Sequence, residues 1–307
     1  MEASIALKNI TKRYGETTVL RQISFGIEKG SALCLVGPGG AGKSVLVRIM
    51  TGITLPDDGS VYIHGMAMHE HLRQVRGLYG YLPENNGLNP NWSLLHNLRL
   101  HGVVSGMTTR AATGRIMELA EQFQVLEYIH DFPDEISPSI VKRAAFIRTI
   151  LPDPPILFLD EPTTGTDYPT KKRIWDYILG HRGQKTILVT LRDLAEAQEY
   201  ADRIVVMDEG RIITDGTPDK LLADAARSTE YVLLFAHATP DHYQRLRAHE
   251  AVVDIEQEEN TFTLLLKEPE AYQEILDTFG KDIVNSRVKK LTLNEVFFEL
   301  PHIDQGI

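Results

Sequence analysis

Gly37-Pro38-Gly39-Gly40-Ala41-Gly42-Lys43-Ser44 is the most specific pattern in this 307-residue chain. Its spacing, G-x-x-x-x-G-K-[ST], is that of a P-loop, in which successive backbone N–H groups surround phosphate oxygens at the start of a helix. The apolar run 32–36 predicts a buried strand before the loop, and residues 44–50 predict a helix after it. The motif requires this strand–loop–helix context, so we expect a nucleoside triphosphate to bind here.

The residue types in the loop explain how it would bind phosphate. Glycines let the backbone approach the ligand, Lys43 would reach the β- and γ-phosphates, and the Ser44 hydroxyl would ligate Mg²⁺. Lys43 is therefore expected to be catalytic as well as nucleotide-binding. The residues predicted to bind the nucleotide in this segment are Gly37, Pro38, Gly39, Gly40, Ala41, Gly42, Lys43, Ser44 and Val45.

A second motif is the apolar run 156–159 followed by Asp160 and Glu161, which is the Walker B pattern. A buried strand that ends in this way presents Asp160 beside the P-loop, where it can hold Mg²⁺ through the Ser44 hydroxyl or a water. Glu161 is then placed to polarise the attacking water. We therefore predict Asp160 as a metal ligand and Glu161 as a catalytic residue.

The bulk composition limits the class of protein. With 43% hydrophobic and 24% charged residues, the chain is expected to form a packed core. A net charge of −10 argues against a nucleic-acid-binding surface. No apolar run approaches the roughly 18 residues that a membrane span needs, and residues 1–4 lack the pattern of a secretory signal. If the chain serves a membrane, we expect it to dock on a separate partner.

The pattern along the chain predicts two parts. Residues 1–225 alternate between short apolar strands and amphipathic helices, with a mostly helical stretch at about 93–150. Residues 226–307 predict a small α+β accessory domain, whose order fits a ferredoxin-like fold. Besides 32–36, the strands expected are 5–10, 19–27, 61–64, 156–159, 186–190, 203–207, 212–213, 231–236, 261–267 and 284–288. The helices expected in the second part are 239–249, 269–279 and one that opens with a capping box at 292–295.

Residues 1–225 resemble the ATP-binding subunits of ABC transporters. The resemblance extends beyond the P-loop to segments 12–15, 80–84, 160–167 and 208–218. It implies an α/β P-loop NTPase fold of the ABC ATPase type, with a RecA-like core, a helical subdomain, an antiparallel β subdomain and the small C-terminal α+β domain. Residues 291–298 resemble the C-terminal extension of the drug-exporter and sodium-exporter branch.

The same resemblance assigns two further residues. Tyr14 matches the aromatic residue that stacks on adenine, so it is predicted to bind the nucleotide. Glu84 matches a loop residue that senses Mg²⁺ and is predicted to contact the metal. Most of the family has glutamine there, and a carboxylate offers oxygen but cannot donate an N–H.

Two segments depart further from the family pattern. Residues 136–140 read Ile-Ser-Pro-Ser-Ile where the signature is Leu-Ser-Gly-Gly-Gln, a motif that binds the γ-phosphate on the partner's P-loop in a dimer. Ser137 is still predicted to bind nucleotide, although Pro138 lacks an N–H and Ser139 adds bulk. The residues also make a sound helix start. Arg192 replaces the switch histidine, and either it binds the γ-phosphate as a catalytic residue or it is a solvated loop arginine.

The resemblance implies an ATPase subunit that powers an exporter by ATP-dependent dimer closure. It implies ATP and Mg²⁺ as cofactors, an integral membrane permease and a second ATP-binding subunit as partners, and a cytoplasmic location, peripheral on the inner face of the cell membrane. No nucleic acid partner is expected. The alternative is a catalytically weak regulatory half of an asymmetric heterodimer, because the changes at 136–140 and Arg192 predict slow or asymmetric hydrolysis.

Three other hypotheses remain open at this stage. A soluble ABC protein that acts on ribosomes or DNA is disfavoured by the single cassette and the acidity. Metal binding by the histidines near His69 is disfavoured because their spacing does not match a zinc site on a helix. The apolar residues Trp92, Leu95, Leu98 and Leu100 form either core or a docking surface for a membrane partner.

Overall fold

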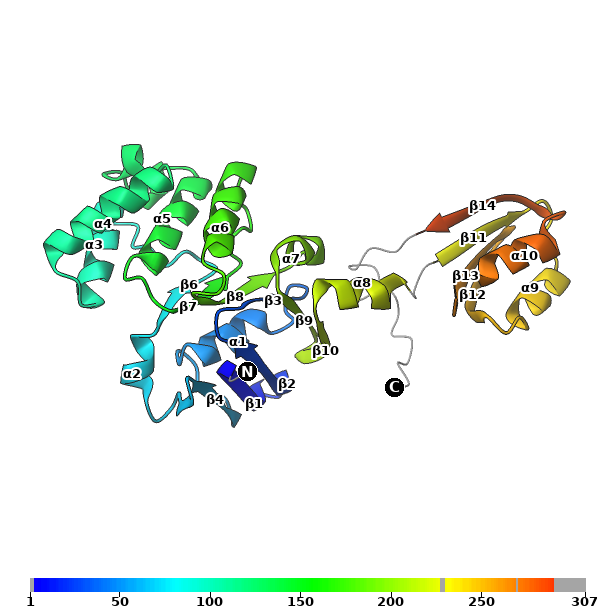
Figure 1. Cartoon of the computed structure of the whole chain (residues 1–307), viewed down its shortest axis with the longest axis horizontal. Helices are drawn as coiled ribbons and strands as arrows, with labels where there is room; N and C mark the ends of the chain where they lie inside the picture. The colour runs from blue at the N-terminus through cyan, green and yellow to red at the C-terminus, as the bar shows by residue number, and fades with distance from the viewer. Residues whose placement is uncertain (1–2, 227–229, 269, 290–307) are drawn as a thin grey trace. The chain divides into compact units, whose positions relative to one another are not determined.

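The computed structural model describes residues 3–226, 230–268 and 270–289 (Figure 1). The chain divides into two compact units, Met1–Gly216 and Thr217–Ile307, each of which is described here by itself. The sequence placed the end of the ATP-binding domain at about residue 225, and that functional division stays a prediction. The helix predicted to open at 292–295 lies outside the described residues.

An antiparallel sheet in the first unit has the strand order β2-β1-β4-β5. Its strands are β1 (Ala3–Tyr14), β2 (Thr17–Glu28), β4 (Asp58–Ile63) and β5 (Met66–Ala67). Alternate residues of β1 and β2 point into one core with α1, since Ile5, Leu20 and Leu46 are fully buried. This sheet is the antiparallel β part that the sequence predicted.

The larger sheet of the first unit has the order β10-β9-β3-β8-β7-β6. Its strands are β3 (Ala32–Val36), β6 (Tyr79–Leu82), β7 (Ile156–Asp160), β8 (Thr186–Leu191), β9 (Arg203–Asp208) and β10 (Arg211–Gly216). All neighbours are parallel except β10, which pairs antiparallel with β9. Every residue of β3, β7 and β8 is buried, which explains their continuous apolar runs.

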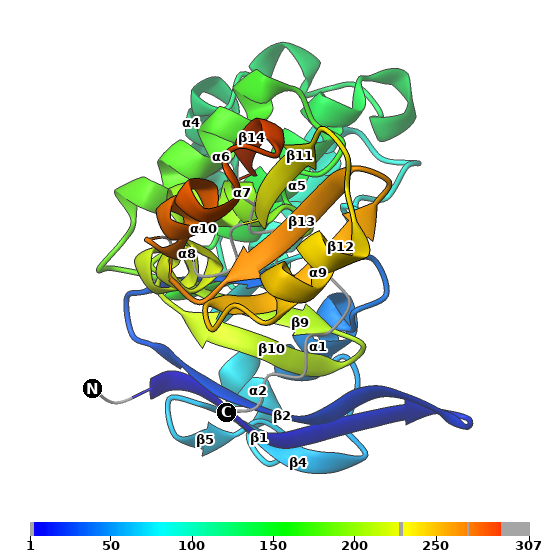
Figure 2. The ribbon, with the colours of Figure 1, turned by 90° about the vertical axis from the view of Figure 1, so that its right-hand side faces the viewer.

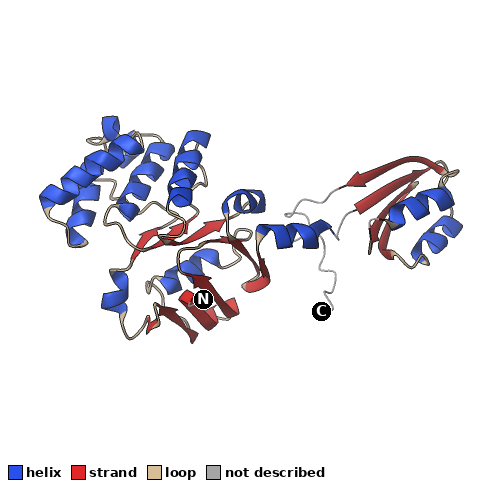
Figure 3. Ribbon diagram, in the orientation of Figure 1, coloured by secondary structure: helices blue, strands red, loops and turns tan. Residues whose placement is uncertain are grey.

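The helices of the first unit are concentrated after the P-loop and between β6 and β8 (Figure 3). They are α1 (Lys43–Met50), α2 (Leu72–Arg76), α3 (Leu94–Val104), α4 (Thr109–Gln122), α5 (Pro138–Ile150), α6 (Tyr168–Gly180) and α7 (Leu194–Tyr200), with the short 3₁₀ turns η1 (Leu126–Tyr128) and η2 (Pro133–Glu135). The helical stretch predicted at about 93–150 is present, and residues 105–108 separate α3 from α4. Helices α3, α4 and α5 contact one another.

The second unit is a four-stranded antiparallel sheet with two helices on one face (Figure 2). Its elements are α8 (Pro218–Ala226), β11 (Glu230–Phe235), α9 (Pro240–Arg247), β12 (Val252–Glu258), β13 (Thr261–Leu266), α10 (Ala271–Phe279) and β14 (Ile283–Lys289). The order β12-β13-β11-β14 is the split β-α-β arrangement of ferredoxin-like folds.

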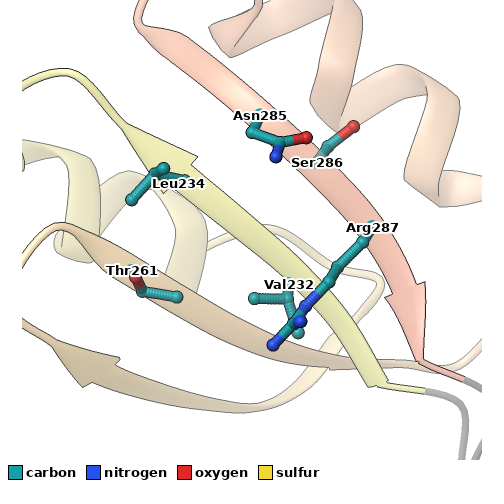
Figure 4. A pocket seen from close by; sticks show the side chains of 6 residues that line it. All are labelled: Val232, Leu234, Thr261, Asn285, Ser286 and Arg287. Carbon is teal, nitrogen blue, oxygen red and sulfur yellow. The ribbon is translucent and has the colours of Figure 1, made fainter.

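The two faces of this second sheet differ. Buried side chains such as Phe235, Phe262 and Ile275 join the helices to the strands on one face. Val232 and Leu234 alternate with buried Leu233 along β11, so their side chains lie on the opposite face. That face carries a hollow lined by Val232, Leu234, Thr261, Asn285, Ser286 and Arg287 (Figure 4). Strand β12 was not predicted from the sequence. Ile255 is its one buried residue, and the polar residues Asp254 and Glu256 flank it, so the strand lacks the alternation of apolar and polar residues that indicates a half-buried strand.

Candidate nucleotide site

The P-loop joins the end of β3 to α1, as the sequence predicted. Gly40 and Gly42 have φ values of 89° and 97°, which favour glycine. A Cβ atom on Gly37 would lie 2.2 Å from the carbonyl oxygen of Met207, so that position excludes any side chain. Among the described residues, no atom lies within 4 Å of the Cβ position of Gly39 or Gly40. The loop is thus packed on one side and open on the other, as a phosphate cradle must be.

Lys43 lies folded against its own loop. Its side chain is 4% exposed, and Nζ donates to the carbonyl oxygens of Gly37 at 2.6 Å and Pro38 at 3.0 Å. Burial lowers the pKa of Lys43, while the carboxylate of Glu161, with Oε1 at 4.0 Å from Nζ, favours the charged form. Among the described residues, this buried ammonium group contacts two carbonyl oxygens and one carboxylate 4.0 Å away, so it is well placed to gain from an anionic ligand.

Asp160 and Ser44 meet at the carboxyl end of β7, as predicted. Asp160 Oδ1 accepts hydrogen bonds from Ser44 Oγ at 3.0 Å and from Thr190 Oγ1 at 2.7 Å. Burial raises the pKa of Asp160 above its usual value, although both hydroxyl groups favour the carboxylate. Adjacent hydroxyl and carboxylate oxygens are the hard ligands that Mg²⁺ prefers, so this pair fits the metal that the P-loop implies.

Thr190 was not singled out from the sequence. It lies opposite Asp160 in the parallel ladder between β7 and β8, and its Oγ1 also accepts the Glu161 N–H at 2.9 Å. The available signal was a polar residue near the carboxyl end of an otherwise apolar strand. Thr190 therefore links the two acids of the Walker B pattern.

Glu161 has an unusual backbone conformation, and the two oxygens of its carboxylate have different surroundings. Its φ is 48°, a left-handed conformation that is rare for a residue with a side chain. Oε1 accepts from Arg192 Nε at 2.7 Å, whereas Oε2 is buried and has no hydrogen-bond partner among the described residues. One oxygen is therefore fixed and the other is left to accept a hydrogen bond, which is the arrangement that a base acting on water needs.

Arg192 follows β8 and joins two acidic residues. Its Nη2 donates to Glu84 Oε1 at 3.0 Å while its Nε donates to Glu161. The hydrogen bond to Glu161 raises the pKa of Arg192, so the guanidinium group stays charged. Although its side chain is 51% exposed, Arg192 is paired with two carboxylates, so it is not an unpartnered loop arginine; its contact with the γ-phosphate stays a prediction. Glu84, 49% exposed in the same pair, lies in this cluster as well.

The altered signature segment forms the start of α5. Ser137 is the N-cap and its Oγ accepts the Ile140 N–H at 3.4 Å, while Pro138 is the first helical residue. Ser139 is buried and its Oγ accepts the N–H of Asp167, the N-cap of α6, at 3.1 Å. These contacts stabilise the starts of α5 and α6.

Tyr14 lies at the end of β1, beside the turn at Gly15. Its side chain is 51% exposed, and Lys12 Nζ lies 5.5 Å from the ring centroid. The exposed ring can stack on a base, so adenine stacking remains a prediction.

Residues 20–164 match the family profile described as ABC transporter. The chain is 35% identical over 223 residues to the Nod factor export ATP-binding protein I of Burkholderia lata, which covers 72% of this chain and 73% of that protein. The chain belongs to the ABC transporter family.

Other ABC proteins agree with this membership. A probable multidrug ABC transporter ATP-binding protein of Escherichia coli is 33% identical over 231 residues, covering 75% of this chain and 40% of that protein. The structure of an ATP-binding subunit of an ABC transporter superposes with a TM-score of 0.66 at 25% identity, covering 72% of this chain and 92% of that one. The predicted fold class, an ABC-type P-loop ATPase with a small C-terminal α+β domain, is confirmed.

Two further observations concern membranes and metals. No helix among the described residues of this ABC ATPase is long and apolar enough to cross a bilayer. The part of the chain that the structure describes also contains no cluster of three histidine, cysteine or acidic residues able to hold a metal ion. His69 and His71 instead lie beside Glu70, at 3.4 and 3.9 Å.

Proposed function

We propose that this ABC ATPase is the motor subunit of an exporter, and that ATP binding closes it on a second ATP-binding subunit. The observation that carries the proposal is the convergence of Lys43, Ser44, Asp160 and Glu161 at the carboxyl edge of the parallel sheet. The names of the relatives point the same way, since they are ATP-binding proteins of Nod factor and multidrug transporters.

The residues of the site take distinct roles in this proposal. The loop N–H groups and Lys43 bind the phosphates, Ser44 and Asp160 hold Mg²⁺ with Glu84 nearby, and Tyr14 stacks on adenine. When bound, Mg²⁺ supplies charge neutralisation on the β- and γ-phosphates. Glu161 Oε2 accepts a hydrogen bond from the attacking water, while Arg192 holds the opposite oxygen of the same carboxylate. The chain's residues thereby orient water rather than form a covalent bond to the nucleotide.

An exposed apolar hollow beside α3 is the proposed docking site for the membrane permease. It is lined by Asn91, Trp92, Ser93, His96, Leu100 and Phe132. Trp92, Leu100 and Phe132 are 41%, 46% and 41% exposed, whereas Leu95 and Leu98 are buried core residues. A coupling element of a permease on this hollow would place the chain on the inner face of the cell membrane.

A second candidate, favoured by the signature segment, is one half of an asymmetric pair. Pro138 has no N–H, the Ser139 hydroxyl is engaged by Asp167, and Ile140 is buried, so this segment offers little to a partner's γ-phosphate. A homodimer would carry the defect in both of its sites. A heterodimer with an intact second subunit would supply a good signature to Lys43 and Glu161.

The deciding experiment measures ATPase activity of the chain alone and with its membrane and second ATP-binding subunits. The motor role predicts that Glu161→Gln nearly abolishes activity of the complex while Mg–ATP still binds. The regulatory role predicts that Glu161→Gln changes little. Calorimetry that detects no Mg–ATP binding by the folded chain, with Lys43→Ala equal to the parent, would reject both.

A further inference from the structure

Lys142 is a buried cation on α5 that has no role in the proposed reaction as described above. It lies five residues after Ser137 on the helix that begins with the altered signature. Its residue is 5% exposed, and its ammonium group donates to the main-chain carbonyl oxygens of Glu84 at 3.2 Å and Glu161 at 3.5 Å. Burying an ammonium group costs free energy unless the group is hydrogen-bonded, so these two hydrogen bonds offset part of the cost of burying Lys142.

The two main chains that Lys142 joins belong to separate strands. Glu84 follows β6 and Glu161 follows β7, and these strands are parallel neighbours. Arg192, arriving from β8, joins the side chains of the same two acids. The catalytic acid is thus held twice, by Lys142 through its backbone and by Arg192 through its carboxylate.

The backbone of Glu161 is the part that most needs such support. Its left-handed φ of 48° is unfavourable for a residue with a Cβ atom, and it persists only where the surroundings fix it. The Glu161 N–H is held by Thr190 Oγ1, and its carbonyl oxygen is held by Lys142. Both polar groups of this residue's main chain are therefore fixed by side chains from other elements.

We propose that Lys142 is a positioning residue for ATP hydrolysis, which fixes the backbone of Glu161 against that of Glu84 and so connects the start of α5 to the water-activating carboxylate. The proposal rests on the proposed ATPase function. Lys142 acts through Glu161, since its ammonium group donates to main-chain oxygens of Glu84 and Glu161. If α5 moves when a partner subunit binds, the Lys142 side chain would transmit that movement to the backbone of Glu161.

The neighbouring residue Arg143 provides a matched control. It is also a buried cation on α5, 9% exposed, and it also donates to two carbonyl oxygens, those of Phe123 at 2.8 Å and Gln124 at 3.1 Å. Those oxygens belong to the two residues that directly follow α4, within the helical part. Arg143→Met therefore removes a comparable hydrogen-bonded charge without touching the catalytic acids.

The first test uses amide hydrogen exchange on the full chain without nucleotide. The reporters are the Asn86 amide, which donates to the Pro83 carbonyl in the loop that contains Glu84, and the Glu161 amide, which donates to Thr190 Oγ1. Lys142→Met should speed exchange of both amides by roughly tenfold, the size of one lost hydrogen bond to a charged group. Arg143→Met should instead speed exchange of the Gln124 and Val125 amides. Equal exchange of Asn86 and Glu161 in the parent and in Lys142→Met would overturn the proposal.

The second test separates catalysis from binding. Lys142→Met should lower kcat roughly tenfold and change Mg–ATP affinity less than about twofold, whereas Lys142→Arg should restore part of kcat. A loss in affinity as large as the loss in kcat, or an equal loss of kcat in Arg143→Met, would reject the positioning role. If the parent complex has no ATPase activity while the exchange pattern holds, the proposed function fails but the backbone contact stands.

Discussion

The Nε atom of Arg192 lies 2.7 Å from Oε1 of Glu161, so the residue predicted to replace the family's switch histidine is hydrogen-bonded to the predicted catalytic acid. The same guanidinium group reaches Glu84 through Nη2 at 3.0 Å. A planar fork with donors in fixed directions can bridge two carboxylates, which a single ring nitrogen or an ammonium group cannot do in the same way. Arg192 thereby couples the loop after β6 to the Walker B strand.

The first prediction concerns this fork. Arg192→Lys keeps the positive charge but removes the paired donors, so we expect kcat to fall roughly tenfold while Mg–ATP affinity stays within about threefold. Arg192→Ala should lose at least as much. Steady-state ATPase together with nucleotide titration measures both quantities. A Lys variant with parental kcat would show that charge alone suffices, and Arg115→Lys, in an exposed pair with Glu118, serves as the control.

The second prediction concerns the signature segment. Ser139→Ala leaves the Asp167 N–H without its hydrogen-bond acceptor at the start of α6, so the free energy of unfolding should fall by about 1 to 2 kcal/mol. Thr113→Ala removes an exposed hydrogen bond from the Thr113 hydroxyl to the Thr109 carbonyl within α4, and it should change the free energy of unfolding by less than about 0.5 kcal/mol. Denaturant unfolding of the nucleotide-free chain gives both values. Equal stability of the two variants would mean that the Ser139 contact contributes nothing.

The third prediction concerns the hollow beside α3. Leu100→Glu places a charge among Trp92 and Phe132, so it should reduce co-purification of a membrane subunit by roughly tenfold or more while Mg–ATP binding is unchanged. Val253→Glu is the matched control, because Val253 is 49% exposed but lies in the second unit. Full recovery of the membrane subunit with the Leu100 variant would place the docking surface elsewhere.

The sequence predicted those features that depend on residues close together in the chain, and it did not predict several contacts between residues far apart in the chain. The P-loop and the Walker B strand were predictable because glycine spacing and an apolar run are local signals, and the helix start at Ser137 was predictable because capping is local. The Ser139–Asp167 contact was not predictable, because those residues meet only when α5 packs beside α6. Likewise, the partners of Arg192 and Lys142 depend on strands β6, β7 and β8 being neighbours.

The fourth prediction is a pair of opposite pH effects on stability. Burial raises the folded-state pKa of Asp160 above its usual 3.8, so its contribution to stability is fully present below that value and is lost as pH rises through the folded pKa. At neutral pH the buried carboxylate therefore opposes folding of the nucleotide-free chain. Asp160→Asn removes this penalty while its Oδ1 can still accept from Ser44 and Thr190, so it should stabilise the chain near pH 7 and abolish Mg²⁺-dependent hydrolysis.

Asp153 supplies the comparison with the opposite sign. The hydrogen bond from the buried Lys185 ammonium, at 2.6 Å, lowers the pKa of Asp153 below 3.8, so its contribution is present above that value and is lost as pH falls through the folded pKa. Asp153→Asn should therefore destabilise the chain near pH 7, and the difference should vanish in acid. Free energies of unfolding at pH 7 and at a pH well below 3.8 measure both variants. Because the two aspartates differ in the sign of their pKa shifts, variants that shift stability in the same direction at pH 7 would contradict the assignment of Asp160 as a buried, destabilising carboxylate that is retained for its chemistry.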